Sequence, residues 1–290
     1  LYSNPDGSEF SMVFQFEHMM LEQEPGKEKW DRIPLPFVRL KRILAKWQEE
    51  LYGCGWNSLF WDNHDLPRIV SRWGDEGKYR EVSAKMLAIA LHGMQGTPFV
   101  YQGEELGMTN VHFPDITWYR DIESLNMYKE RMAAGYSEHA VMDSIYSTGR
   151  DNARTPMQWD DSKNAGFTQG DPWMAVNPNY LQINAAAQVH HPDSVFACYQ
   201  RLISLRKSYP VFVEGRFRLL LEQDQQIFAY VRECEKEKLL VCANFTSRPA
   251  PFSLPEEWQE AEILIQNYPE KNTESCLRPY EALIYRKTSE

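Results

Sequence analysis

The sequence predicts an α/β fold followed by an antiparallel β domain. Three short apolar runs rich in Phe and Val alternate with two helical segments, an order that is typical of parallel β–α–β units. From about residue 210 the pattern changes to short alternating strands separated by turn residues. We therefore predict a first domain at residues 1–209, with a loop-rich insertion at 108–180, and an antiparallel β-sandwich domain at residues 210–290.

The individual elements follow from apolar periodicity and from turn and capping residues. The run FSMVFQFEH, from Phe10 to His18, comes after a cluster of turn formers and predicts a buried strand. The other predicted elements of the first domain are a helix at 35–52, a strand at 57–61, a helix at 80–94, a strand at 97–101, a helix at about 121–148 and a helix at 193–208 capped by Asp193 or Ser194. Six or so strands are predicted beyond residue 210.

Composition excludes several classes of partner. The net charge is −10, so the surface field repels phosphate backbones and anionic lipid, and we expect no nucleic-acid partner. No stretch approaches the ~20 apolar residues that cross a bilayer, so we expect no membrane association. Five Cys without CxxC spacing favour reduced thiols and a cytoplasmic location. The spacing of His, Cys, Asp and Glu predicts no metal and no cofactor.

Polar clusters follow the second and third predicted strands. Asn63, His64 and Asp65 end the run FWDNHD, and Gln102 to Glu105 end TPFVYQGEE. In parallel α/β proteins such strand ends carry chemistry. A carboxylate there can stabilise the positive charge that develops on a sugar ring as its glycosidic bond breaks, and an imidazole can donate to sugar hydroxyls. The alternative is a capping or turn motif, because Asp and Asn favour loop starts.

Other charged residues have weaker signals. Arg154 lies in the neutral run DNARTPMQW, where its guanidinium needs an anionic or polyol partner, or else a structural salt bridge. Glu104 and Glu105 are adjacent on a segment expected to be extended, so they point in opposite directions and favour a structural role. Glu17 and His18 end the first predicted strand and are weaker candidates for substrate contact.

Three segments together carry a family resemblance. FWDNHDLPR at 60–68, GTPFVYQGEELGM at 96–108 and GRDNARTPMQW at 149–159 occur in this order. They resemble glycoside hydrolase family 13, the α-amylase superfamily, and in particular its oligo-1,6-glucosidase and dextran glucosidase branch. The likeness extends from about Phe10 to the end of the chain. It implies that the first domain holds the sixth to eighth strands of a partial (β/α)8 TIM barrel.

The resemblance also implies roles for individual residues. Asp65 matches the family's transition-state-stabilising aspartate, and His64 matches a residue that contacts the glucose being transferred. Arg154 looks like the arginine that holds the non-reducing glucose and makes such enzymes act on chain ends. Arg150 and Asp151 are expected to support the loop.

One departure from the family pattern concerns catalysis itself. Family members carry a nucleophilic aspartate on the fourth strand and an acid/base glutamate on the fifth, and no GxRxD segment or strand-ending Glu of that kind precedes residue 10. Retaining hydrolysis needs both groups, about 5 Å apart. We therefore expect the chain alone to be catalytically incomplete. Its expected partner is the missing N-terminal half of the barrel or a second copy in a homo-oligomer.

The resemblance implies an exo-acting retaining α-glucosidase whose substrates are small α-1,6-linked isomalto-oligosaccharides. GRDNARTPMQW and NAGFTQGDPW favour this substrate over trehalose 6-phosphate. The alternatives left open are a trehalose-6-phosphate hydrolase and a non-catalytic carbohydrate-binding fragment.

Overall fold

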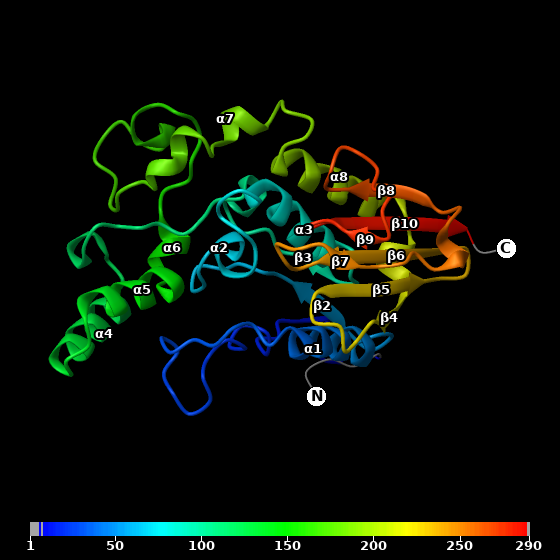
Figure 1. Cartoon of the computed structure of the whole chain (residues 1–290), viewed down its shortest axis with the longest axis horizontal. Coiled ribbons are helices and arrows are strands. Elements are labelled where there is room, and N and C mark those ends of the chain that lie inside the picture. The colour runs from blue at the N-terminus through cyan, green and yellow to red at the C-terminus, as the bar shows by residue number, and fades with distance from the viewer. Residues whose placement is uncertain (1–5, 7, 289–290) are drawn as a thin grey trace.

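The structure is a computed structural model that describes residue 6 and residues 8–288. Its N-terminal part contains three short parallel strands in the order β1-β2-β3 (Figure 1). They are β1 (Met12–Val13), β2 (Trp56–Leu59) and β3 (Thr97–Pro98). Met12 pairs with Trp56, and Ser58 pairs with Thr97. The parallel arrangement expected from the order of elements is confirmed, although each strand is shorter than the apolar run that predicts it.

Helices α1 (Phe37–Glu50) and α3 (Arg80–His92) connect these strands, with the short helix α2 (Ile69–Trp73) between them. Both long helices confirm the predicted ranges. Residues Met86 to Leu91 of α3 are all buried, so this helix is apolar nearly all round. The reason is its position, since α3 packs against α8 (Val195–Ser208) and against strands β6 (Glu237–Asn244) and β10 (Ala282–Thr288). Ser194 caps α8 by accepting from the backbone N–H of Ala197.

The predicted single helix at 121–148 is wrong. The structure has two helices there, α4 (Ile122–Ala133) and α5 (Glu138–Thr148). Gly135 has a φ of +88°, a left-handed conformation that ends the first helix at no cost to a residue without Cβ. Ser137 then caps α5 by accepting from Ala140 N–H.

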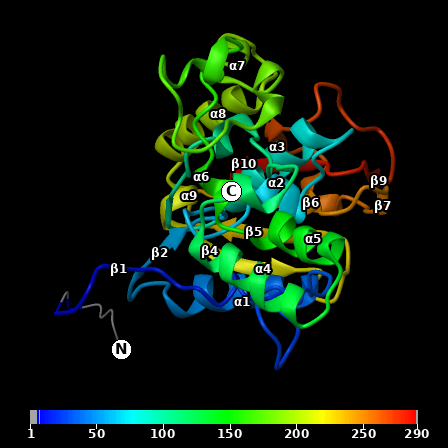
Figure 2. The same ribbon diagram turned by 90° about the vertical axis from the view of Figure 1, so that its left-hand side faces the viewer.

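The insertion has a small core of its own, and the two helices contribute Met127, Val141 and Ile145 to it. Helices α4 and α5 lie at the end of the molecule opposite the C-terminal sheet, and Figure 2 shows them from that end. The rest of the insertion contains α6 (Asp151–Arg154) and several single 3-10 turns, and α7 (Ala185–Gln188) follows it.

The C-terminal part, preceded by α9 (Val211–Glu214), is an antiparallel five-stranded sheet in the order β4-β5-β6-β10-β8. Strands β7 and β9 form a separate two-stranded ribbon. The antiparallel sheet expected from the alternating pattern is confirmed; β9 is a two-residue strand that the pattern did not indicate. The strands not yet given bounds are β4 (Arg216–Leu220), β5 (Ile227–Glu233), β7 (Ala250–Pro251), β8 (Glu262–Gln266) and β9 (Cys276–Leu277).

Successive side chains of β5 and β6 point to opposite faces of the sheet and therefore belong to two separate cores. Phe228 and Tyr230 point toward α3 and belong to the main core, which the sheet shares with α1, α3 and α8. Ala229 and Val231 point to the opposite face and pack in a second cluster with Trp258 and with the β7–β9 ribbon. Because Tyr230 also donates to the carbonyl of Ala90 at 2.8 Å, the sheet is joined directly to α3.

The expectation of a buried first strand is wrong. Phe10, Phe14 and Phe16 are exposed, as are Phe99 and Val100 near β3. These side chains leave an apolar face of the three-stranded sheet open, because no described element covers it. A hollow of about 400 Å³ lies against this face. Its lining residues are Phe14, Phe16, Phe60, Asp62, Asn63, His64, Phe99, Val100 and Tyr101.

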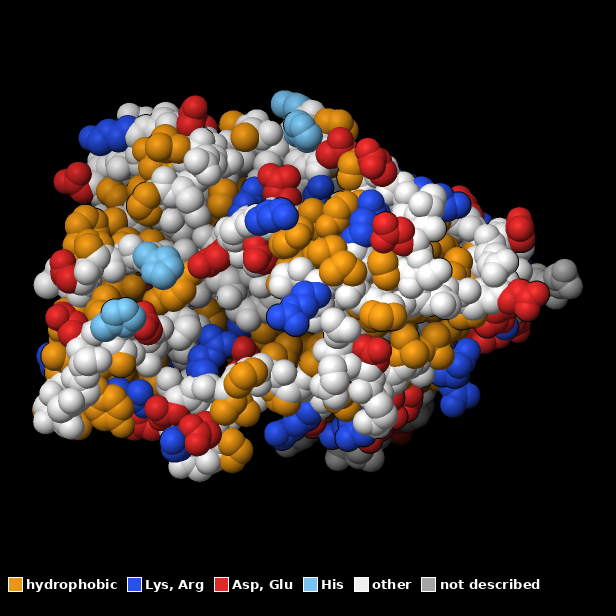
Figure 3. Space-filling view, in the orientation of Figure 1, with side chains coloured by type: hydrophobic (Ala, Val, Ile, Leu, Met, Phe, Trp, Pro, Cys, Tyr) orange, Lys and Arg blue, Asp and Glu red, His pale blue; other side chains and the backbone are white. Residues whose placement is uncertain are grey.

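Elsewhere the surface is mixed. In the orientation of Figure 1, the space-filling view shows acidic and basic side chains interspersed with apolar ones, rather than gathered into one patch of a single sign (Figure 3). No helix in the described part of the chain combines the length and the apolar character that a membrane span requires.

Candidate active site

The turn after β2 places the sequence-predicted residues at the surface. Asn63 Oδ1 accepts a hydrogen bond from Asp65 N–H at 2.8 Å, which closes a tight turn directly after the buried segment Phe60–Asp62. The turn leaves the side chains of His64 and Asp65 71% and 44% exposed. Asn63 therefore shapes the loop, while the side chains of His64 and Asp65 reach the solvent.

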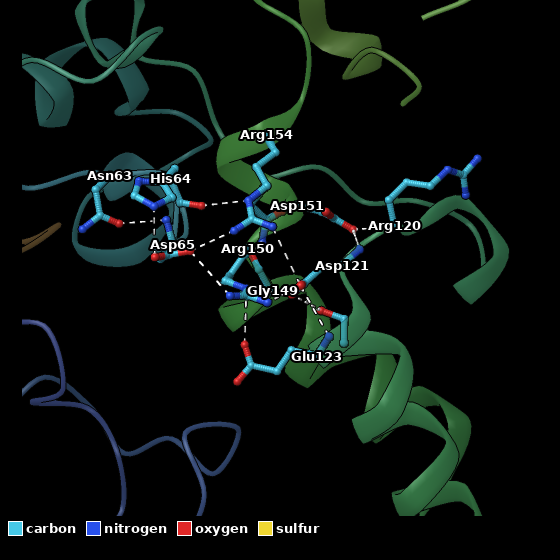
Figure 4. A network of polar contacts seen from close by, with 12 residues as sticks. Asn63, His64, Asp65, Arg120, Asp121, Glu123, Gly149, Arg150, Asp151 and Arg154 are labelled. Carbon is cyan, nitrogen blue, oxygen red and sulfur yellow. Dashed lines mark hydrogen bonds and ion pairs between the residues drawn. The ribbon is translucent and has the colours of Figure 1, made fainter. Parts of the chain in front are cut away.

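Asp65 contacts three basic side chains (Figure 4). Arg154 Nη2 donates to Asp65 Oδ1 at 2.8 Å, and His64 Nε2 lies 3.2 Å from Oδ2. Arg150 is more distant, with Nη1 3.6 Å from Oδ1. Arg154 also donates from Nε to the carbonyl of His64 at 2.9 Å. The structure thus brings together all three residues that the sequence singles out as catalytic or substrate-binding.

Arg154 is the last residue of the short helix α6, and Arg150 is its N-cap. A second carboxylate lies on the other side of the two arginines from Asp65. Asp121, at the N-terminus of α4, accepts from Arg150 Nε at 3.2 and 3.1 Å and from Nη2 at 2.5 Å. Arg154 Nη1 lies 3.8 Å from the same carboxylate, and Glu123 lies 3.3 Å from Arg150. Burial raises the pKa of Asp121, but Arg150, the Glu123 N–H and Arg154 together outweigh burial and hold that pKa below its ordinary value.

Asp151 fixes the position of Asp121 by binding the backbone next to it. Its buried Oδ2 accepts from the N–H groups of Arg120 and Asp121 at 2.7 and 2.9 Å. Asp151 therefore supports the loop as expected, whereas Arg150 does more than support it. Sequence reasoning missed Asp121 and Glu123. The Asp-x-Glu start of a helix was a visible capping signal, but it did not indicate the ion pair with residue 150.

A fully buried polar layer lies beneath the turn. Burial raises the pKa of Asp62 to about 7, although Arg68 opposes this shift. Burial also raises the pKa of Glu104 well above its ordinary value, and the Tyr199 hydroxyl donates to Glu104 at 2.8 Å. Arg68 donates to the carbonyl of Gln102 after β3 and to those of Asn152 and Ala153 in α6, the last two at 3.1 and 3.3 Å. This layer ties the strand ends together below the exposed carboxylate.

The structural role expected for the adjacent glutamates agrees with these contacts, but its premise is wrong. Glu104 and Glu105 lie in a 3-10 turn rather than on an extended segment. Glu104 bonds Tyr199, and Glu105 accepts from Gly103 N–H at 2.8 Å. Both carboxylates are thus occupied within the fold.

The two weaker candidates do not face the site. His18 is 2% exposed, lies 2.8 Å from the Gln15 amide, and lies 3.2 Å from the carbonyl of Phe60. Burial, with a contribution from Arg72, lowers the pKa of His18 to about 4. Glu17 instead pairs with Lys46 of α1 at 2.9 Å. His18 is therefore a neutral core residue, and Glu17 belongs to a surface ion pair.

Two hollows border the turn. Asp65 lines a small hollow of about 70 Å³ together with Met20, Glu22 and Arg32. His64 lines the larger aromatic hollow of about 400 Å³ against the open sheet face. Among the described residues, no group of three or more His, Cys, Asp or Glu side chains is placed to hold a metal ion. The site can therefore offer a carboxylate, an imidazole and two guanidinium groups to a polar ligand.

Comparisons with known proteins identify the family of the chain. The family described as "Alpha amylase, catalytic domain" matches residues 1–215, and "Alpha-amylase SusG C-terminal domain" matches residues 227–284. An oligo-1,6-glucosidase of Parageobacillus thermoglucosidasius is 54% identical over 99% of this chain and 52% of its own length. A trehalose-6-phosphate hydrolase of Bacillus subtilis (strain 168) is 48% identical over 99% of this chain and 52% of its own length.

Among solved structures, the chain is similar to the trehalose-6-phosphate hydrolase of Bacillus licheniformis, with a TM-score of 0.95 and 46% identity. That match covers 99% of this chain and 53% of the solved one. The chain thus spans about half the length of the relatives it matches. The match of the catalytic-domain family to residues 1–215 places the chain in the α-amylase family, glycoside hydrolase family 13.

Proposed function

We propose that this chain forms the part of an exo-acting, retaining α-glucosidase that carries Asp65, and that the enzyme cleaves α-1,6-linked glucose from the non-reducing ends of isomalto-oligosaccharides. The observation that carries the proposal is the Arg154–Asp65 contact, which holds an exposed carboxylate at the end of a parallel strand. Relatives named oligo-1,6-glucosidase, at 54% identity, support the substrate class.

In this proposal Asp65 acts by charge. As the glycosidic bond breaks, the sugar ring becomes an oxocarbenium-like cation, and an ionised carboxylate close to it stabilises that state more than the ground state. His64 donates to a hydroxyl of the same glucose. Arg154 orients Asp65 and presents its remaining N–H groups to the non-reducing end, so that longer chains cannot pass.

The nucleophile and the proton donor would come from outside residues 1–290, in a complete (β/α)8 barrel whose sixth to eighth strands are β1, β2 and β3. The open apolar face formed by Phe14, Phe16, Phe99 and Val100 supports this proposal. Such a face is unfavourable in water, and among residue 6 and residues 8–288 no strand pairs with the outer edges of β1 and β3, which can therefore accept a neighbour. The covering element would be the rest of the barrel or a second copy of the chain.

The proposed setting is the cytoplasm, with a small oligosaccharide as ligand and no nucleic-acid or membrane partner, consistent with the net charge of −10. Trehalose-6-phosphate hydrolase is the rival activity, because relatives with that name reach 48% identity. It would require a site for the phosphate in addition to the glucose.

The test is to express the protein from its whole reading frame and to assay isomaltose and trehalose 6-phosphate in parallel. The proposal predicts turnover of isomaltose with α-glucose as the first product, which NMR of the anomeric proton detects. Turnover of trehalose 6-phosphate alone would reject the substrate assignment. If the expressed protein consists of residues 1–290 alone and binds glucosides without cleaving them, the carbohydrate-binding alternative is favoured.

A further inference from the structure

Arg150 stands between two carboxylates and is closer to one of them. Its Nη2 lies 2.5 Å from Asp121 Oδ1, whereas its Nη1 lies 3.6 Å from Asp65 Oδ1. Glu123 lies 3.3 Å from the Nε of Arg150 and, like Asp121, attracts Arg150 away from Asp65. Figure 4 shows Arg150 between Asp65 on one side and Asp121 and Glu123 on the other. Arg150 is thus paired closely with Asp121 and only at longer distance with Asp65.

Asp121 is built to hold a cation. Its side chain is 1% exposed, so water does not compete for it, and its carboxylate also lies 3.8 Å from Arg154. The backbone N–H of Asp121 donates to the buried Asp151 at 2.9 Å, which fixes the position of the residue. Its side chain accepts from Ser124 Oγ at 3.3 Å as well. A carboxylate fixed at three points can hold Arg150 in one geometry.

We propose that Asp121 is a positioning residue that holds Arg150 at the longer distance from Asp65, so that less of the negative charge of Asp65 is offset before it meets the sugar. The inference rests on the proposed function, since it concerns the charge that the glycosidic transition state would meet. Asp65 Oδ1 already accepts from Arg154. A second arginine at the same distance would neutralise the carboxylate and weaken its stabilisation of an oxocarbenium-like ring.

Coulomb's law gives the expected size. At an effective dielectric constant of about 20, moving a unit charge from 3.6 Å to 2.8 Å from a carboxylate oxygen strengthens the pair by about tenfold in an equilibrium constant. Because Asp65 is 44% exposed, screening by water reduces that factor to several-fold. The charge of Asp121 therefore decides which carboxylate Arg150 prefers.

The variant Asp121→Asn isolates this charge. Asn is nearly the same size and is equally favoured as a helix cap, so it can still accept from Glu123 N–H at the start of α4. Asp115→Asn is the matched control, because Asp115 also caps a helical turn through its side chain but is only half-buried and lies outside the network. Both variants are made in the protein expressed from its whole reading frame.

With isomaltose as substrate, Asp121→Asn is expected to lower kcat by about fivefold, with KM changed by less than about twofold, since the lost charge acts on the transition state. Adding Arg150→Gln to Asp121→Asn is expected to recover most of that loss, because the freed cation is then absent. Asp115→Asn is expected to stay within about twofold of the parent kcat. A double variant no more active than Asp121→Asn overturns the inference and leaves Asp121 as a structural residue.

A second measurement does not need activity. A double-mutant cycle with Arg150→Gln and Asp65→Asn, followed by urea unfolding, gives the coupling between those two side chains. In the Asp121→Asn background this coupling is expected to rise several-fold in the unfolding equilibrium constant. Unchanged coupling rejects the inference whether or not the protein cleaves glucosides. Raised coupling in a protein without glucosidase activity supports the hold of Asp121 on Arg150 and rejects the proposed function alone.

Discussion

Arg154 donates to Asp65 Oδ1 at 2.8 Å although 89 residues separate the two in the chain. The same guanidinium donates to the carbonyl of His64 at 2.9 Å, so it grips the turn by side chain and by backbone. Two donors on one planar group fix both distance and orientation. The carboxylate at position 65 is therefore oriented by α6 and is not left to rotate in solvent.

This double contact predicts that lysine cannot replace Arg154. A lysine ammonium is a single point on a flexible stem and cannot hold the carboxylate and the carbonyl in one plane. Arg154→Lys is expected to lower kcat/KM for isomaltose by about 100-fold, equivalent to roughly 2.7 kcal/mol. The control is Arg218→Lys on the exposed side of β4. Steady-state kinetics of the two variants decide the matter, and equal kcat/KM values would show that Arg154 needs only its charge.

Lys41 predicts a large stability effect far from the site. Its buried ammonium donates to the carbonyls of Leu221, Asp224 and Ile227 at 2.6, 2.7 and 3.0 Å, and burial lowers its pKa to about 8. Lys41→Met leaves these carbonyls without a donor and is expected to cost about 2–4 kcal/mol in the free energy of unfolding.

The neighbouring residue provides the control for Lys41. Arg42 is on the same helix, but its ion pair with Glu222 is exposed, so Arg42→Met is expected to cost less than about 1 kcal/mol. Urea unfolding of both variants measures the difference. Similar losses for the two would mean that water replaces the lysine in the turn between β4 and β5.

Asp62 predicts a specific pH dependence of stability. Its pKa is raised by burial from 3.8 to about 7, so between these pH values the folded protein holds a proton that the unfolded chain has released. The free energy of unfolding should therefore fall as pH rises from about 4 to about 7, by up to roughly 1.4 kcal/mol per pH unit, and then stay level as far as this group is concerned.

The variant Asp62→Asn removes this contribution of Asp62 to the pH dependence of stability. Relative to the parent, the variant should gain stability between pH 4 and pH 7 and keep the gain above pH 7. The exposed Asp161→Asn is the control and should leave the parent's pH dependence unchanged. Thermal unfolding from pH 4 to pH 8 measures both, and parallel curves for Asp62→Asn and the parent would contradict the raised pKa.

The order of elements was predictable because local patterns specify it. Apolar periodicity located α1 and α3, and the pair Asp193 and Ser194 indicated the start of α8, where the structure has Ser194 as the cap. The break between α4 and α5 also had a local signal in Gly135 and Ser137, but the apolar pattern on either side continues and hid it. Where a local pattern and a turn signal conflict, the turn residue with a positive φ decides.

Long-range contacts were not predictable in the same way. Asp121 and Arg150 are 29 positions apart, and nothing in either local pattern indicates that they pair. His18 was expected near a ligand because it ends a strand, yet the carbonyl of Phe60 and the amide of Gln15 draw it into the core. Residues 64, 65 and 154 were found by resemblance to a family, since ordinary turns contain the same residue types.

The most direct test of the account is the kcat of Asp65→Asn in the protein expressed from its whole reading frame, with isomaltose as substrate. Asn keeps the size and can still accept from Arg154, so the melting temperature should stay close to that of the parent. The account predicts a fall in kcat of about a thousandfold or more, because the charge that offsets the developing cation is lost. A folded Asp65→Asn variant that retains kcat within about tenfold of the parent would contradict the account.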